Sequence, residues 1–240
     1  MFCNQCEQAA NGTGCNISGV CGKKPDVAAL QDHLLFGLKS LALYADRIGR
    51  NAEIDRFTIE GLFTTVTNVD FDAPRIGGLI KRCYELKEKA RAAAGATISN
   101  PVADWKPAED LAGMIAQGEQ HGINTQHVNE DIRSVIEILM YGLKGMAAYM
   151  DHAMILGRTD DEVMAFFQKA LAATTDSSLG LILPRAAVVA DQMAVFFQAG
   201  ISVSRQHFAM GVDVDPLAFG LLEDLFHHLQ VVTGDENCLA

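Results

Sequence analysis

Apolar residues recur at every third or fourth position along most of the chain, which is the period of an amphipathic α-helix. The first such stretch begins at Pro25, a residue that suits the first turn of a helix, and it ends at Gly49. A break is expected around Pro101 and Pro107. The pattern predicts long helices over about 25–49, 57–66, 74–95 and 132–157.

The pattern repeats within the chain. Gly37-Leu38-Lys39 reappears as Gly142-Leu143-Lys144, an offset of 105 residues. The next predicted helix matches at an offset of 109, so about four residues are inserted in the turn of the second copy. Other matched pairs are Tyr44 with Tyr149, Asp46 with Asp151, Phe57 with Phe166, Leu62 with Leu171 and Thr65 with Thr174. We expect Tyr44 and Tyr149, like Lys39 and Lys144, to share a packing role.

No window alternates apolar and polar residues in the two-residue period of a half-buried strand. The sequence therefore predicts an all-α fold with an N-terminal cysteine loop, two tandem three-helix bundles and an extra C-terminal helix. We expect the cysteine loop over residues 1–25, the first bundle over 26–100, the second over 101–200 and a divergent helical tail over 201–240.

The tail carries a wide apolar stripe that includes Leu222 and Phe226. A stripe of this width needs to be covered by other protein surface. We therefore expect a homo-oligomer, a homodimer formed through the C-terminal helix.

The net charge is −11 and the hydrophobic share is 49%. This is enough apolar material for a real core. A negative chain repels nucleic acid and anionic membrane surfaces, so we expect neither as a partner. No apolar stretch is long enough to span a bilayer, and the N-terminus lacks the pattern of a secretory signal. We expect a soluble, cytoplasmic protein.

Four of the six cysteines crowd into the start of the chain, at Cys3, Cys6, Cys15 and Cys21. Thiolates are soft ligands that select zinc or iron–sulfur chemistry. Structural zinc sites usually combine two short Cys-x-x-Cys pairs, and only one exists here. Interspersed glycines let the backbone amides approach sulfide, which favours an iron–sulfur cluster. Zinc, and reactive or structural thiols, remain the alternatives.

The flanking residues carry a resemblance to a known family. Met1-Phe2-Cys3-Asn4-Gln5-Cys6-Glu7-Gln8, Gly14-Cys15 and Gly19-Val20-Cys21-Gly22-Lys23 resemble the start of the hybrid-cluster proteins, also called prismanes or hydroxylamine reductases. The likeness continues through Leu30-Gln31-Asp32, Gly142-Leu143-Lys144-Gly145 and Ala148-Tyr149-Met150-Asp151-His152. The resemblance implies a first domain built of two three-helix bundles. It also implies a 4Fe-4S cluster with Cys3, Cys6, Cys15 and Cys21 as ligands.

In that family a second, mixed cluster is the catalytic centre, and two further domains hold it. Outside the cysteine loop this sequence has only Cys83 and Cys238, and Cys83 lies in a helical pattern typical of a buried free thiol. We therefore assign no catalytic residue and expect a non-catalytic electron-transfer protein with a redox partner protein. Two alternatives are a sensor of nitric oxide or oxygen, and a subunit of a split hydroxylamine reductase-like enzyme.

Lys23 and Lys24 follow the last cysteine of the loop directly. Two interpretations are open from the sequence. Both lysines are solvated charges, or they offset the negative charge of a cluster and raise its reduction potential.

Overall fold

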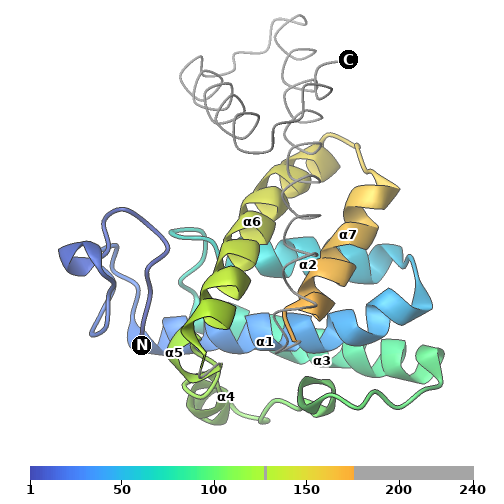
Figure 1. The fold of residues 1–240 in the computed structure, drawn as a ribbon, viewed down its shortest axis with the longest axis horizontal. Coiled ribbons are helices and arrows are strands. Elements are labelled where there is room, and N and C mark those ends of the chain that lie inside the picture. Colours follow the sequence, from blue (N-terminus) through green and yellow to red (C-terminus); the bar gives the residue numbers. More distant parts are fainter. Residues whose placement is uncertain (127–128, 176–240) are drawn as a thin grey trace, which may run out of the picture. The chain divides into compact units, whose positions relative to one another are not determined.

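The protein is described here from a computed structural model, whose described residues are 1–126 and 129–175 (Figure 1). All of them belong to one compact unit, Met1–Ala186. Within these ranges the secondary structure is helical, with one isolated bridge between Cys3 and Cys15 and no strand. The all-α prediction is confirmed.

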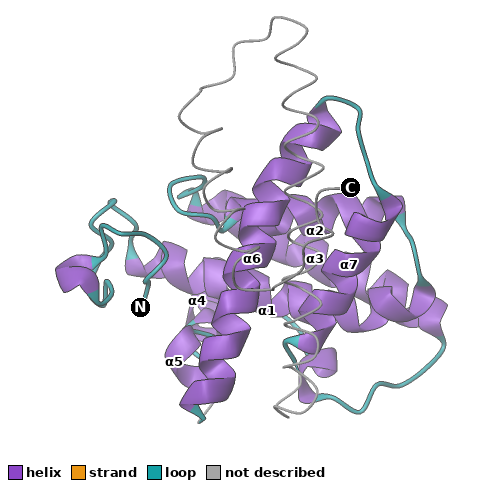
Figure 2. Ribbon diagram, turned by 45° about the horizontal axis from the view of Figure 1, so that its top comes forward, coloured by secondary structure: helices purple, strands orange, loops and turns teal. Residues whose placement is uncertain are grey.

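The described helices alternate with short loops (Figure 2). They are η1 (Ala10–Gly12), α1 (Pro25–Ile48), α2 (Ala52–Thr64), α3 (Ala73–Ala94), η2 (Pro101–Asp104), α4 (Leu111–Gly118), α5 (Ile123–Gln126), α6 (Glu130–Ile155) and α7 (Asp161–Ala173). No described helix is both long and apolar enough to cross a membrane. The predicted tail over 201–240, with Leu222, Phe226 and Cys238, lies outside the described residues.

The repeat seen in the sequence is confirmed at both ends of α2 and α7. The side chains of Asn51 and Asp160, which lie 109 residues apart, accept the first backbone N–H groups of their helices. At the other ends, the Thr65 hydroxyl donates to the Leu62 carbonyl at 2.8 Å, and the Thr174 hydroxyl donates to the Leu171 carbonyl at 2.6 Å. The same capping chemistry thus defines the same element twice.

The helices of the two halves are interleaved. The long helix α1 packs against α7 of the second half, and the long helix α6 packs in the same way against α2 of the first half. Helix α1 also packs against α3 and α4. Both views show α6 crossing α1 steeply (Figures 1 and 2). The predicted boundary at residue 100 stays a prediction.

The close approach of α1 to its neighbours depends on small residues. The ring of Trp105 lies over Gly37, where an added Cβ would come within 2.6 Å of the ring. Gly118, at the end of α4, lies against the backbone of Ala29. Cys83 is fully buried in α3, which confirms the expectation of a buried thiol.

The expectation of a shared packing role is confirmed only for the lysine pair. Lys39 and Lys144 are both buried. Tyr44 is 1% exposed in the core, whereas Tyr149 is 45% exposed on α6, so a shared role of the two tyrosines stays a prediction. The difference in exposure arises because α1 is covered by helices on more sides than α6 is among the described residues.

Candidate functional site

The cysteine loop lies at the edge of the described helices, beyond the start of α1 (Figure 1). Its first and third cysteines face each other across an antiparallel bridge. The Cys3 amide donates to the Cys15 carbonyl at 3.0 Å, and the Cys15 amide donates back at 2.8 Å. Directly opposed residues of an antiparallel pair project their side chains from the same face. The chain therefore holds these two thiols side by side.

The other two cysteines lie in tight turns of the same loop. The Cys6 carbonyl accepts the Ala9 amide at 3.1 Å, and Cys21 lies inside the turn that the Gly22 amide closes on the Gly19 carbonyl at 2.9 Å. A Cβ at Gly19 would lie 2.9 Å from the Cys21 sulfur, so glycine keeps the space beside this thiol open. These features fit a loop that wraps around an inorganic cluster.

The Cys15 sulfur sits in a field of backbone amides. The Ala10 amide donates to it at 3.4 Å. The amides of Ala10 and Val20 hold the pKa of the Cys15 thiol below its usual value, and Lys23 acts in the same direction. This environment favours the thiolate, the form that binds metal.

Two contacts fix the loop to α6. The Tyr141 hydroxyl donates to the Asn4 side-chain carbonyl at 2.5 Å. The Gln5 side chain bridges two elements when its amide is assigned the orientation that satisfies both neighbours, so that its oxygen accepts from Lys144 Nζ at 3.0 Å and its nitrogen donates to the Thr65 carbonyl at 3.2 Å. The first Cys-x-x-Cys segment is therefore anchored to the helical body by its two central residues.

Beneath the loop lies a cavity of about 30 Å³ between α1 and α6. It is large enough for a water molecule. Three pairs of corresponding residues, each 105 positions apart, line it from the two helices. They are Asp32 with Glu137, Leu35 with Met140, and Lys39 with Lys144. Phe2, Cys3, Gln5 and Lys23 close the cavity on the side of the loop. We call it the acid–lysine cavity.

The charged groups of the acid–lysine cavity are strongly perturbed. Burial raises the pKa of Asp32 to about 7, although the neighbouring lysines oppose this rise. Burial lowers the pKa of Lys144 to about 8, against the opposing effect of Asp32. Burial likewise raises the pKa of Glu137 and lowers that of Lys39. Such shifts are typical of functional sites.

Within residues 1–126 and 129–175, no three His, Cys, Asp or Glu side chains converge in the way that one metal ion requires. A cubane cluster binds each thiolate through a different iron, so its ligands do not meet at one point. In the structure the backbones of Cys3 and Cys15 form an antiparallel bridge, and Cys6 and Cys21 lie in turns of the same loop. The set of four ligands stays a prediction.

The comparison with known protein families agrees with this geometry. Residues 1–196 match the Prismane/CO dehydrogenase family. The chain belongs to this family. The match includes the whole cysteine loop, both copies of the repeat and the acid–lysine cavity.

Several prismane relatives are closely similar in sequence. The chain is 57% identical over 198 residues to the hydroxylamine reductase of Geobacter sulfurreducens, and 56% identical over 197 residues to that of Geobacter metallireducens. It is 48% identical over 192 residues to the hydroxylamine reductase of Methanocella arvoryzae. The matches cover about 76% of this chain but only about 36% of the Geobacter proteins. The chain thus spans about a third of the length of these relatives.

Sequence reasoning missed the pairing of Asp32 with Glu137. Both are acidic and lie 105 residues apart, so the offset already found for Lys39 and Lys144 points to them. The structure also separates the two lysines after Cys21, because Lys23 is buried and Lys24 is exposed. Only Lys23 therefore acts on the loop without screening by solvent.

Proposed function

We propose that this chain is an electron-transfer protein that holds one 4Fe-4S cluster through Cys3, Cys6, Cys15 and Cys21. The observation that carries the proposal is the opposed pair of Cys3 and Cys15 within a loop built of turns. Membership of the prismane family supports iron–sulfur binding. The space that Gly19 leaves beside Cys21 supports the participation of the fourth thiol.

When bound, the cluster supplies storage for a single electron. The chain contributes the thiolates and the amides that stabilise their negative charge. The Ala10 amide acts at Cys15, while Tyr141 and Lys144 hold Asn4 and Gln5, the two residues between Cys3 and Cys6. The loop lies at the edge of the described helices (Figure 1), and we expect a redox partner protein to bind on this side. Because the chain is acidic, a basic partner surface is favoured.

The first test is anaerobic purification followed by iron and sulfide quantitation and EPR of the reduced protein. We expect about four iron and four sulfide per chain. Serine at Cys3, Cys6, Cys15 or Cys21 removes or alters the cluster. Cys83→Ala is the matched control and keeps the full iron content, because Cys83 is buried in α3, away from the loop. Zinc without sulfide would overturn the assignment of the cluster.

The second test separates cluster binding from electron transfer. A protein that carries electrons shows a reversible one-electron couple in an EPR-monitored redox titration. If the protein holds the full cluster but shows no reversible couple, the assignment of the cluster stands and the electron-transfer role is overturned.

A second candidate function is that of a subunit in a larger hydroxylamine reductase-like assembly. It rests on the named relatives, which are hydroxylamine reductases about three times as long as the matched region. The expected result is co-purification with a second iron–sulfur chain. A chain that purifies alone from its native cells, with its cluster intact, argues against this candidate. The sensing alternative depends on the tail, which lies outside the described residues.

A further inference from the structure

The acid–lysine cavity brings equivalent charges from both copies of the repeat to one place behind the cysteine loop. Asp32 and Lys39 project from α1, and Glu137 and Lys144 occupy the corresponding positions of α6. Lys23 adds a further cation from the loop itself. Since Cys3 lines the same cavity, these charges border a predicted cluster ligand directly.

The position of Lys144 connects the cavity to the loop. Its ammonium group donates to the Gln5 side chain, which lies between the first two cysteines, and the charge of Cys3 acts on it. Lys144, Lys39 and Lys23 are all buried. Buried charges are screened far less than surface charges, so their effect on a nearby centre is large.

The charges of the cavity do not cancel. Besides the predicted cluster ligand Cys3 and the phenol of Tyr141, whose pKa burial raises to about 12, the titratable lining consists of three lysines and two carboxyl groups. The side chains around the predicted ligand Cys3 therefore include one more basic group than acidic groups.

We propose that the acid–lysine cavity, chiefly through Lys144, raises the reduction potential of the cluster held by the cysteine loop. The inference rests on the proposed function. A one-electron donor protein passes one electron to the cluster, no covalent bond forms or breaks, and the negative charge of the loop rises by one. A fixed positive charge next to Cys3 stabilises the more negative, reduced state.

The experiment compares the midpoint potentials of cluster-loaded variants at pH 7 by EPR-monitored titration. Lys144→Gln is expected to lower the equilibrium constant for reduction of the cluster about tenfold. This corresponds to a midpoint potential lower by about 59 mV for a one-electron couple. Lys39→Gln shifts the potential in the same direction, and Asp32→Asn shifts it in the opposite direction. Lys144→Arg, which keeps the charge, retains the original potential.

Lys24→Gln is the control for proximity in sequence. Lys24 follows Lys23 directly in the sequence, so it is also close to Cys21 along the chain. Unlike Lys23, however, its side chain is exposed. The potential of this variant is expected to equal that of the original protein. Equal shifts for Lys24→Gln and Lys144→Gln would show a general charge effect and overturn the role of the cavity.

Iron and sulfide content separates the possible failures. If the unmodified protein holds no cluster, the proposed function fails, and this inference fails with it. If the variants are loaded and their potentials do not move, only the tuning role is overturned. If Lys144→Gln and Asp32→Asn both lose the cluster while the unmodified protein keeps it, the cavity is a structural support for the loop, and tuning is again overturned.

Discussion

At the scale of single residues, two histidines form an unusual pair in the interior. His33 of α1 and His121, which follows α4, approach each other with their Nδ1 atoms 2.9 Å apart. The His121 ring stacks on Phe36 with a centroid separation of 3.8 Å. One Nδ1 donates and the other accepts, so both rings cannot be cationic. Burial lowers the pKa of each histidine to about 4.

This pair predicts a loss of stability in mild acid. The unfolded chain binds protons near pH 6.5, the folded protein only near pH 4, so the stabilising effect is complete above pH 6.5 and is lost as the pH falls towards 4. Each histidine contributes a slope of about 1.4 kcal/mol per pH unit in this window. Urea unfolding between pH 7.5 and 4.5 measures it.

His121→Phe keeps the aromatic stack and removes one titrating group. The free energy of unfolding of this variant is expected to depend less steeply on pH than that of the original protein. The difference in slope corresponds to one bound proton, about 1.4 kcal/mol per pH unit. Parallel pH profiles for the two proteins would show that the pair does not control acid stability.

Replacement by alanine is expected to have opposite effects on stability at two glycines. A Cβ at Gly118 would overlap the backbone carbonyl of Ala29, which is unable to move aside. Gly118→Ala is therefore expected to destabilise the protein by about 2 kcal/mol. At Gly78, on the exposed side of α3, a Cβ meets no atom within 4 Å. Gly78→Ala is expected to stabilise by roughly 0.5–1 kcal/mol. Chemical denaturation measures both, and equal stabilities would contradict the tight contact of α4 with α1.

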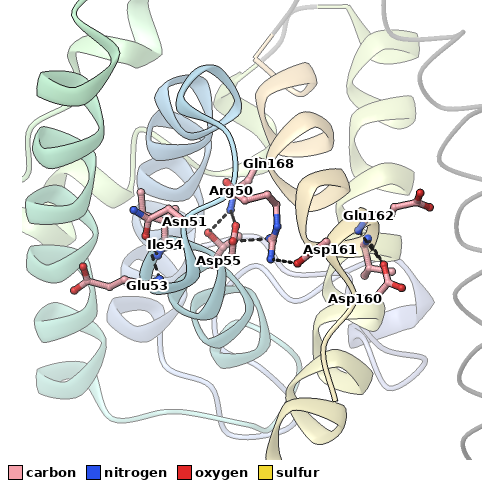
Figure 3. A network of polar contacts seen from close by, with 11 residues as sticks. Arg50, Asn51, Glu53, Ile54, Asp55, Asp160, Asp161, Glu162 and Gln168 are labelled. Atoms are coloured by element: carbon pink, nitrogen blue, oxygen red, sulfur yellow. Dashed lines mark hydrogen bonds and ion pairs between the residues drawn. The ribbon is translucent and has the colours of Figure 1, made fainter. Parts of the chain in front are cut away.

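At the scale of elements, a polar network joins the starts of α2 and α7 (Figure 3). Arg50 donates to Asp55 at 2.5 Å and to Asp161 at 2.8 Å. The Gln168 amide donates to Asp55 at 3.4 Å and to the Thr58 hydroxyl at 3.1 Å. Burial raises the pKa of Asp55, and this effect exceeds the opposing influence of Arg50. Burying the charge of Asp55 therefore costs more than the ion pair with Arg50 returns.

The network predicts that hydrogen bonding, more than charge, stabilises this junction. Asp55→Asn keeps an acceptor oxygen and is expected to stay within about 0.5 kcal/mol of the original stability. Asp55→Ala leaves buried donors without an acceptor and costs about 2 kcal/mol. Asp161→Ala is the control, with an effect below about 0.5 kcal/mol because this side chain is 86% exposed. A large loss in Asp55→Asn would show that the charge itself is required.

The helices and their repeat were predictable because each helix carries its own local signals. Apolar periodicity locates α1 and α6, and a residue such as Pro25 or Gly95 marks a helix end. The interleaving of the two halves was not predictable, since periodicity shows which face is buried but not which helix covers it. The acid–lysine cavity was missed for the same reason. In the sequence Asp32 and Glu137 look like ordinary polar positions, and only the arrangement of α1 and α6 brings them to one cavity.

At the scale of the whole molecule, the described part of the chain consists of a helical body with its own core and a loop with little core of its own. In residues 1–24 only Gly14, Cys15 and Lys23 are buried, and η1 is the one short helical element. The loop touches the body through Asn4, Gln5 and the lining of the cavity. Ordering a loop of this kind costs conformational entropy that metal binding offsets.

We therefore predict that removing the cluster loosens the loop and leaves the helices folded. Anaerobic chelation is expected to open residues 1–24 to limited proteolysis and to hydrogen exchange, while the far-UV circular dichroism changes little. Cys15→Ser is expected to behave like the chelated protein, because it removes a ligand and the thiol to which Ala10 donates. Cys83→Ala keeps the loop protected. A cooperative loss of helix upon chelation would contradict this division, and it would mean that α1 and α6 need the loaded loop to cover the acid–lysine cavity between them.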